Sequence, residues 1–391
     1  MKEWEEVLLT DVATKIGDGL HGTPKYDIGG DYYFINGNNL VSGKVVIKED
    51  TKRVNKSEYL KHSKPINERT LLLGINGTIG NVAYYKNEKC MLGKSACYIN
   101  VNDETDLQFI YYTLVNKDFQ NYIEGIATGT TILNVPLKGI REYTVKLPSL
   151  PEQRAIASIL SSLDDKIDLL HRQNATLEKM AETLFRQWFV EEAKEEWKNG
   201  KVSDLIKILS GYAFKSSSFV ESGKYRLITI KGVQDGYLEL NNADKIEEVP
   251  DRMPDFCKLE IGDIILSLTG NVGRCCLVDT TDLLLNQRVA KLHPIYERDR
   301  AYTYFLFRQP QIKQLLEEMG KGTAQPNLSP IETSNMELII PDEEKLIEFS
   351  VMATPLLNKM LFNKKSIQTL TALRDTLLPK LMSGEVRVVQ D

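Results

Sequence analysis

The sequence predicts a mixed α/β (α+β) protein made of two similar halves, with two long helices that form an antiparallel coiled coil. Three observations support this fold class: a repeat at a constant offset, short β-branched and aromatic runs separated by turn residues, and two stretches with a heptad pattern. The chain of 391 residues is long enough for two or three domains of roughly 100–200 residues each. We therefore expect a pseudo-twofold internal repeat.

The repeat has an offset of 193 residues, which is the separation between Trp4 and Trp197. Its clearest segment is LGINGTIGN at residues 73–81, which matches LSLTGNVGR at residues 266–274. Further pairs at this offset are Asp11 and Asp204, Gly43 and Gly236, Thr130 and Thr323, Asn134 and Asn327, and Pro148 and Pro341. Agreement at so many positions indicates a duplicated unit rather than two similar turns.

Each half has a strand-rich part followed by a helical part. Runs such as Tyr32–Ile35 and Asp263–Leu268 are separated by Gly, Asn and Asp, as strands and turns are. We predict an α/β domain at residues 1–148, a helical spacer at 149–193, a second α/β domain at 194–341 and a second spacer at 342–391. Shorter helices are expected near residues 106–123 and 300–319.

The two spacers carry heptad seams that predict how they pair. The first seam consists of Ile156, Leu160, Leu163, Ile167, Leu170, Asn174, Leu177, Ala181, Leu184 and Trp188. The second consists of Phe349, Ala353, Leu356, Met360, Asn363, Ile367, Leu370, Arg374, Leu377 and Leu381. We expect an antiparallel register in which Asn174 meets Asn363, so that the numbers of paired residues sum to 537. Only Leu163 against Arg374 is then a poor pair.

Composition excludes several classes of protein. The chain has 42% hydrophobic and 26% charged residues, which is typical of a globular protein. No apolar run is long enough to span a bilayer, and the acidic start MKEWEE does not resemble a signal peptide. The five cysteines are few and odd in number, so we expect no disulfide scaffold and a cytoplasmic location. With a net charge of −5, a nucleic-acid site would have to be a local cluster.

No catalytic, metal or cofactor motif is present. Gly93-Lys94-Ser95 resembles the end of a phosphate-binding loop, but Glu88 stands where that loop needs its first glycine. The glycine turns at 77–80 and 270–273 are too short for a dinucleotide-binding loop, and the four histidines and five cysteines lack metal-ligand spacing. Two similar domains that lack a catalytic motif and are joined by a helical spacer suggest a protein that reads two related sites on a duplex.

The chain resembles the specificity (S) subunit of type I restriction–modification systems. The residues that carry the resemblance are LPSLPEQRAI at 147–156 with a weaker echo IPDEE at 340–344, GDIILS at 262–267 followed by GNVG at 270–273, Asn286-Gln287, the two Gly-Thr segments, and LLPKLMSG at 377–384. Two departures are Gly93-Lys94 in place of a second Asn-Gln pair, and Lys345 in place of the glutamine of the first helix.

The resemblance implies a non-catalytic subunit with two target recognition domains. Each domain would read one half of a bipartite, gapped sequence of double-stranded DNA, and the helices would dock two methyltransferase (M) subunits. S-adenosylmethionine and ATP would be bound by partner subunits, with restriction (R) subunits able to join the assembly. Partner-docking candidates, expected on exposed faces of the helices, are Glu152, Gln153, Arg154 and Arg186.

The DNA-binding candidates lie in matched turns and loops that offer donors and acceptors for bases and phosphates. In the first half they are Lys15, His21, Thr23, Lys25, Asn36, Asn38, Asn39, Asn76, Thr78, Lys94, Ser95, Thr130 and Thr131. In the second half they are Tyr212, Lys215, Ser216, Lys231, Asn271, Arg274, Gln287, Arg288, Lys321, Thr323 and Gln325. Two alternatives stay open at this point: a protein scaffold that binds no DNA, and a DNA-acting enzyme such as a nuclease or a fused methyltransferase.

Overall fold

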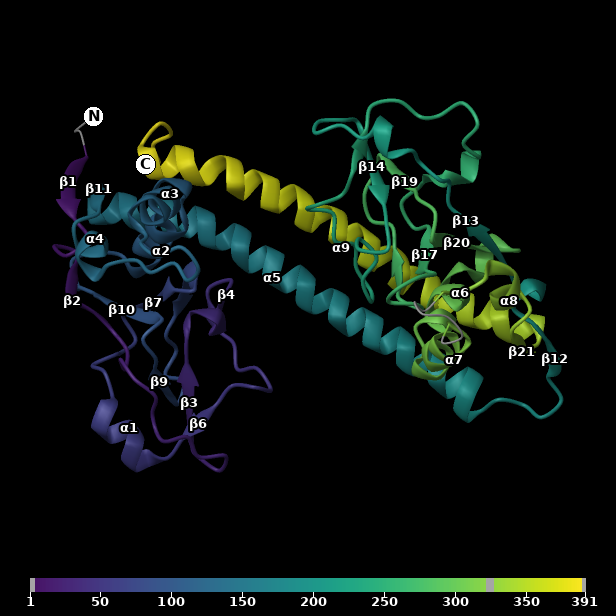
Figure 1. The fold of residues 1–391 in the computed structure, drawn as a ribbon, viewed down its shortest axis with the longest axis horizontal. Helices are drawn as coiled ribbons and strands as arrows, with labels where there is room; N and C mark the ends of the chain where they lie inside the picture. Colours follow the sequence, from purple (N-terminus) through teal and green to yellow (C-terminus); the bar gives the residue numbers. More distant parts are fainter. Residues whose placement is uncertain (1–3, 321–326, 389–391) are drawn as a thin grey trace. The chain divides into compact units, whose positions relative to one another are not determined.

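The computed structural model describes residues 4–320 and 327–388, which belong to two compact units. Unit 1 is formed within residues 1–166 and 370–391, and unit 2 is formed within residues 167–369. Each unit contains an α/β domain together with part of each long helix, α5 (Leu150–Arg186) and α9 (Glu343–Ser383) (Figure 1). The four-part division at residues 148, 193 and 341 stays a prediction. None of the helices in the described ranges combines the length and the apolar character of a membrane span.

Unit 1 is built on an antiparallel sheet with the strand order β2-β10-β7-β8. Its strands are β2 (Ala13–Asp18), β10 (Ala96–Val101), β7 (Thr70–Asn76) and β8 (Thr78–Tyr84). Successive side chains of a strand point to opposite faces. Leu71 and Leu73 therefore pack in the core shared with α2 (Leu107–Val115) and α3 (Lys117–Ile126), whereas Leu72 packs in a second core on the other face. Burial on both faces explains the unbroken apolar run in β7.

Shorter elements cover the second face of this sheet. A small sheet contains β6 (Arg53–Val54), β3 (Tyr32–Ile35) and β9 (Cys90–Leu92), and its strands β3 and β9 are parallel. The pair of β4 (Leu40–Val41) and β5 (Lys44–Val45) also packs in this second core, and α1 (Lys56–His62) packs against the small sheet. By contrast, β1 (Glu5–Leu8) paired with β11 (Thr144–Leu147), and α4 (Leu137–Arg141), contribute to the core that contains α2 and α3. Helix α1 begins after Asn55, whose side chain accepts a hydrogen bond from the Glu58 N–H.

Unit 2 repeats this architecture. Its main sheet has the order β13-β20-β17-β18, with β13 (Ile206–Ser210), β20 (Val289–Pro294), β17 (Ile264–Ser267) and β18 (Cys275–Leu277). Its second sheet contains β15 (Lys245–Ile246), β14 (Tyr225–Ile228), β19 (Leu283–Leu285) and β16 (Lys258–Leu259). The remaining elements are β12 (Lys198–Lys201) paired with β21 (Glu337–Ile340), α6 (Arg300–Phe307), α7 (Pro310–Gly320) and α8 (Pro330–Ser334).

The predicted repeat is confirmed element by element. Both bounds shift by 193 residues between β1 and β12, β3 and β14, β9 and β19, β10 and β20, α4 and α8, and β11 and β21. The parallel pairing of β3 with β9 recurs as that of β14 with β19. Helix α1 has no α-helical counterpart in unit 2, where the corresponding stretch leads through a 3-10 turn at Asp255–Cys257 into β16. The duplicated part is therefore the scaffold, and the segments between strands differ.

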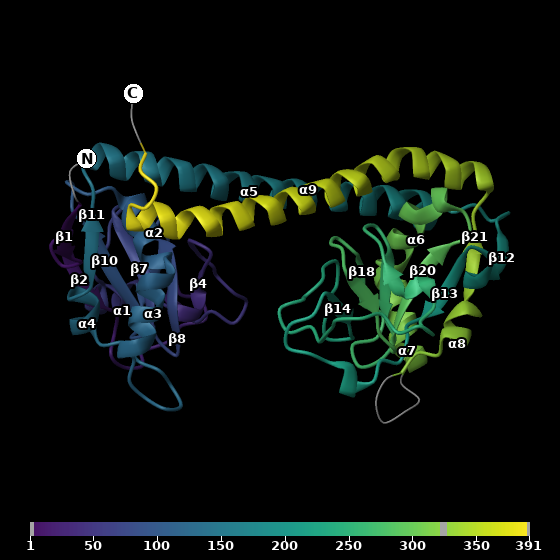
Figure 2. The same ribbon diagram turned by 90° about the horizontal axis from the view of Figure 1, so that it is seen from above.

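In each unit a segment of α5 lies antiparallel to a segment of α9 (Figures 1 and 2). In unit 2, Asn363 Nδ2 donates to Asn174 Oδ1 at 2.9 Å, and the rings of Trp188 and Phe349 are 6.3 Å apart. In unit 1, Ile156 and Leu381 share one core. Each of these pairs sums to 537, so the predicted register is confirmed within unit 2, and the shared core of unit 1 is consistent with it.

Arg374, the one mismatched residue of the seam, finds a polar partner. Its Nη1 donates to Asp164 Oδ1 at 2.8 Å, and Tyr112 of α2 donates to the other oxygen of Asp164 at 2.7 Å. Because Asp164 neighbours Leu163, the guanidinium avoids burial against leucine and instead links α9 to α5 and the α/β domain of unit 1.

Candidate nucleic-acid interface

The predicted DNA-binding loops of unit 1 converge at one end of its main sheet. Asp18 at the end of β2 lies opposite Cys97 at the start of β10, and Gly74 near the end of β7 lies opposite Ala96. Since neighbouring strands are antiparallel, the loop after β2, the loop before β10 and the β7–β8 turn share this end. Lys15 is an exception, because it lies opposite Asn100 toward the other end of β2.

Side-chain hydrogen bonds tie these loops together. Ser95 Oγ donates to Asn36 Oδ1 at 2.8 Å and accepts from the Gly37 N–H at 3.0 Å. Asn76 Nδ2 donates to Asn134 Oδ1 at 3.1 Å, which attaches the β7–β8 turn to the segment 128–134. These contacts make Asn36, Asn76 and Ser95 supports for the loops, with side chains that are only partly exposed.

Unit 2 repeats the convergence with different side chains. Thr269 Oγ1 donates to Asn327 Oδ1 at 2.7 Å, at positions 193 residues beyond the Asn76–Asn134 pair. The Gln287 N–H donates to the Tyr212 carbonyl at 2.9 Å, which joins the loop after β13 to the loop before β20. Both units therefore present a cluster of loops at the same end of an equivalent sheet.

Most of the predicted DNA-binding side chains in these clusters are exposed. They are His21, Thr23, Lys25, Asn38, Thr78, Lys94, Thr130 and Thr131 in unit 1, and Lys215, Ser216, Lys231, Asn271, Gln287 and Arg288 in unit 2. Tyr212 and Arg274 are partly exposed. Lys321, Thr323 and Gln325 lie outside the described residues.

Asn39 is a correction to the prediction. Its side chain is 4% exposed and donates to the Val46 carbonyl at 3.0 Å and to Thr51 Oγ1 at 3.2 Å. Its Oδ1 accepts the Asn36 N–H at 3.0 Å. Asn39 thus holds the loop that precedes β4 and offers no free edge to a ligand, because a turn asparagine and a reading asparagine look alike in sequence.

Arg288 combines exposure with an unusual backbone conformation. Its φ of 70° is left-handed, which a non-glycine residue adopts only when its surroundings impose it. The Leu268 N–H donates to the Arg288 carbonyl at 2.9 Å and holds this turn. The guanidinium is thereby presented at the surface of the loop cluster, where it is suited to a guanine edge or a phosphate.

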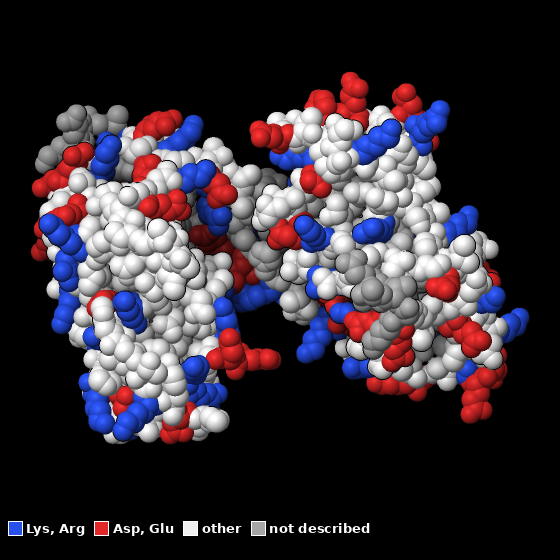
Figure 3. Space-filling model, in the orientation of Figure 1, with Lys and Arg blue, Asp and Glu red and all other residues white. Residues whose placement is uncertain are grey.

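Charge on the face seen in Figure 3 is mixed rather than strongly basic. On this face, Lys and Arg are interspersed with Asp and Glu over both units (Figure 3). His21 is paired with Asp18 in the loop after β2. An anionic ligand would therefore be held by individual cations and loop dipoles rather than by a broad positive field.

The predicted partner-docking residues have different surroundings. Gln153 is 2% exposed, its Oε1 accepts the Asp106 N–H at 2.9 Å and its Nε2 donates to the Pro148 carbonyl at 2.8 Å. The expectation that Gln153 lies on an exposed face is therefore wrong. Glu152 is partly buried against Arg387, whereas Arg154 and Arg186 are exposed.

An apolar groove along the helices of unit 2 was not predicted. It has a volume of about 800 Å³ and is lined mainly by residues of α5, with Met352 and Leu356 from α9. Met180 and Met352 are 54% and 51% exposed. These methionines lie outside the heptad seam, and the heptad pattern predicts only the buried seam positions. Their exposure is the signal that reveals the groove.

The sequence of this chain matches one protein-family model twice. The model described as the type I restriction modification DNA specificity domain matches residues 1–179 and again residues 194–372. The chain belongs to this family of specificity subunits. The two matched regions begin 193 residues apart, in agreement with the repeat seen in the strands.

Individual family members resemble the chain over most of its length. It is 26% identical to the type I restriction enzyme MjaIX specificity subunit of Methanocaldococcus jannaschii, over 99% of this chain and 94% of that protein. It is 22% identical to the HindI specificity subunit of Haemophilus influenzae, over 71% and 77% of the two chains. The crystal structure of the type I restriction-modification S subunit from M. genitalium has the same fold, with a TM-score of 0.62 at 20% identity over 99% of this chain and 97% of that one.

Proposed function

We propose that this specificity subunit reads a bipartite, gapped sequence of double-stranded DNA, with one α/β domain on each half of the target. The observation that carries the proposal is the duplicated loop cluster, which offers exposed donors and acceptors at the same end of two equivalent sheets. Two recognition surfaces related by a repeat suit two half-sites on one duplex. Membership of a DNA specificity family supports DNA rather than a protein as the ligand.

The two half-sites should differ in sequence, because equivalent positions carry different side chains. Lys94 and Ser95 in unit 1 correspond to Gln287 and Arg288 in unit 2, at an offset of 193. Glutamine suits adenine and arginine suits guanine, whereas Lys94 suits a phosphate or guanine and the Ser95 hydroxyl is engaged by Asn36. An asymmetric target therefore follows from the same scaffold.

We also propose that the helices dock two methyltransferase subunits. The groove of unit 2 exposes Met180 and Met352, and an offset of 193 relates these residues to Leu373 and Ile159 of unit 1. Leu373 is 45% exposed and Ile159 is 36% exposed. Each unit thus offers an apolar patch at equivalent helix positions, which fits two copies of one partner. The chain itself would be non-catalytic, with S-adenosylmethionine and ATP bound by partner subunits.

The test is co-expression of the chain with the methyltransferase subunit of its own system, followed by sequencing of the host DNA for methyladenine. We expect methylation at one asymmetric, gapped motif with modified adenines in both halves. A stable complex that methylates no motif would contradict DNA reading and favour the scaffold alternative.

A binding measurement on the purified complex complements the methylation map. Lys94→Gln should weaken binding at all sequences and lower the salt dependence of log Kd by about one ion. The matched control is Lys146→Gln, an exposed lysine on β11, outside the loop cluster. Equal losses for the two variants would contradict the placement of the interface.

A further inference from the structure

A three-residue segment of unit 2, Gln234–Gly236, contacts both predicted DNA-binding loops and the long helices. Gln234 Nε2 donates to the Lys231 carbonyl at 2.8 Å, and its Oε1 accepts from Nη1 of Arg274. The side-chain amide of Asn271, oriented by its neighbours, also accepts from Arg274. The distances from the amide oxygen to Nη1 and Nη2 of Arg274 are 3.2 and 3.3 Å. One glutamine amide therefore holds the Arg274 guanidinium at a set position relative to Lys231.

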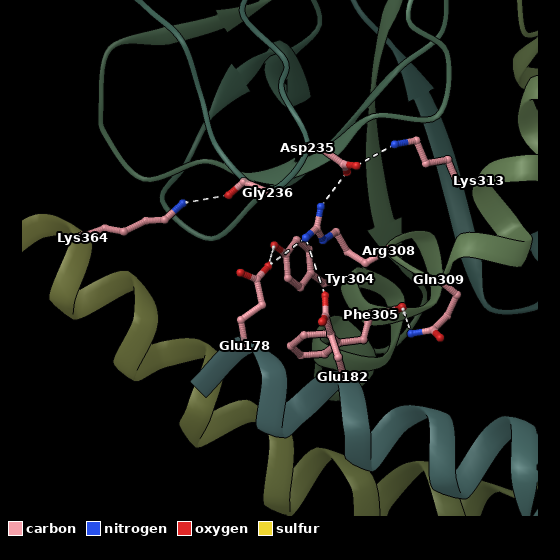
Figure 4. A network of polar contacts seen from close by, with 10 residues as sticks. All are labelled: Glu178, Glu182, Asp235, Gly236, Tyr304, Phe305, Arg308, Gln309, Lys313 and Lys364. Atoms are coloured by element: carbon pink, nitrogen blue, oxygen red, sulfur yellow. Dashed lines mark hydrogen bonds and ion pairs between the residues drawn. The ribbon is translucent and has the colours of Figure 1, made fainter. Parts of the chain in front are cut away.

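The next residue, Asp235, fastens this segment to the domain and to helix α5. Arg308 Nη1 of the α6–α7 region donates to Asp235 Oδ1 at 2.6 Å, and Lys313 Nζ of α7 donates to Oδ2 at 2.6 Å. Figure 4 shows Arg308 between Asp235 and Glu178 of α5, to which its Nη2 donates at 3.2 Å. Glu182, one helical turn further along α5, lies 3.6 Å from the same Nη2.

These charges are partly shielded from water, which strengthens their interaction. The side chains of Arg308 and Glu178 are 15% and 25% exposed. Burial alone would raise the pKa of Asp235, but the hydrogen bond from Lys313 and the charge of Arg308 outweigh it and hold that pKa below its ordinary value. Asp235 is therefore a carboxylate at neutral pH, with both oxygens engaged.

Gly236 connects the segment to helix α9. Lys364 Nζ donates to the Gly236 carbonyl at 3.3 Å, while the Gly236 N–H donates to the Cys275 carbonyl at 2.9 Å. Its φ of +86° is left-handed, and an added Cβ would lie 3.3 Å from Arg308 Nη2. Glycine is needed at this position for both reasons.

Unit 1 keeps the backbone of this turn but not its side chains. Gly43, 193 residues earlier, has a φ of +78°, and its N–H donates to the Val82 carbonyl at 3.2 Å. Val41 stands where unit 2 has Gln234, and Asn81 stands where it has Arg274. Asn81 Nδ2 donates directly to the Leu40 carbonyl at 2.8 Å. The side-chain linkage is thus specific to unit 2, and unit 1 serves as an internal control.

We propose that Gln234 and Asp235 are positioning residues that connect Arg274 to the helices α5 and α9. They thereby set how strongly the second domain prefers its own half-site over a mismatched one. This inference rests on the proposed DNA-reading function. Holding a flexible arginine in place before DNA arrives removes part of the ordering cost of binding, which corresponds to an affinity gain of about 2- to 10-fold. The gain is confined to the base pair that Arg274 contacts.

The experiment measures Kd for the complex of full-length chain and methyltransferase on the methylation motif, and on duplexes with one base pair replaced at a time. Arg274→Ala identifies the affected base pair. Gln234→Leu should lower the ratio of mismatch Kd to motif Kd at that base pair by about 2- to 10-fold, with no change in the other half-site. Gln234→Glu should lower the ratio less than Gln234→Leu does, because a carboxylate still accepts from Arg274 although it cannot donate to the Lys231 carbonyl. Gln314→Leu is the matched control, since Gln314 is exposed and its side chain, within the described part of the chain, bonds only Glu318 of α7.

Several outcomes overturn the inference. An unchanged ratio in Gln234→Leu, an equal loss in both half-sites, or an Arg274→Ala variant that alters no single base pair would each do so. Should Gln234→Leu fail to fold, Lys313→Met loosens Asp235 from a partly exposed position and should produce the same one-sided loss. If the unmodified complex discriminates no sequence at all, the proposed function itself is wrong, and that result is distinct from the others.

Discussion

Replacing the asparagine pair of the helices gives a quantitative test of the packing in unit 2. Asn363 is fully buried, its Nδ2 donates to Asn174 Oδ1 at 2.9 Å, and its Oδ1 has no hydrogen-bond partner among the described residues. Asn174 is partly exposed and also donates to the Met360 carbonyl at 3.2 Å. Leucine has the same number and branching of side-chain heavy atoms as asparagine, so substitution changes polarity more than shape.

The difference in burial predicts an asymmetry between the single variants. Asn174→Leu leaves the buried Asn363 amide without its main acceptor and should cost about 1–3 kcal/mol of unfolding free energy. Asn363→Leu should be nearly neutral, because water can reach the oxygen of Asn174. The double variant should be at least as stable as the unmodified protein, since both polar groups of the pair are replaced by apolar ones. The coupling free energy of the cycle should therefore be at least as large as the loss in Asn174→Leu, about 1–3 kcal/mol.

Urea unfolding followed by tryptophan fluorescence measures these values. In a Trp4→Phe background, the two remaining tryptophans, Trp188 and Trp197, both report on unit 2. Gln173→Leu is the control, because among the described residues the side-chain hydrogen bond that it removes is the longer one of 3.4 Å from Asn363. A larger loss for Asn363→Leu than for Asn174→Leu, or a coupling free energy near zero, would refute the reasoning.

Further predictions concern unit 1 and the thiols. Gly19→Ala should destabilise unit 1 in thermal unfolding, because the new Cβ would overlap the Leu92 carbonyl. Gly125→Ala in α3 should instead stabilise unit 1 by about 0.5–1 kcal/mol, because its Cβ meets no atom within 4 Å. Tyr112→Phe removes a 2.7 Å hydrogen bond to Asp164 and should lower the unfolding free energy by about 1.5–3 kcal/mol in the same measurement. Tyr237→Phe is the control and should cause no measurable loss, because Tyr237 is exposed and its hydroxyl has no hydrogen bond in the described chain. Burial raises the pKa of Cys90 and Cys276 from 9.0 to about 12, so native protein at pH 8 should react slowly with Ellman's reagent, and unfolded protein rapidly. Since the raised pKa favours the neutral thiol, the stability it contributes should be complete below pH 9 and be lost as the pH rises toward 12, which unfolding curves measured across that range would show.

Local patterns were sufficient wherever a property depends on spacing along the chain. The 193-residue offset predicted the equivalence of β10 with β20 and of β11 with β21, because duplicated sequence forms duplicated strands. The heptad seams predicted that Asn174 meets Asn363, because a helix places every third or fourth residue on one stripe and only one register aligns the single asparagine of each seam. The family resemblance rests on the same kind of evidence, motifs read in order.

The roles of single polar residues were decided only by tertiary structure. Asn38 and Asn39 are neighbours of one type, yet Asn38 is exposed and Asn39 is 4% exposed, since the loop turns one side chain toward Val46 and Thr51. Gln153 faces Pro148 and Asp106 rather than a partner, and Gln234 bonds Arg274 from 40 residues away. No pattern along the chain records such contacts, because hydrogen bonds form between groups that folding brings together. Thus the sequence alone determined the duplicated scaffold and its helix register, while the fold decided which side chains hold the loops and which remain available to a ligand.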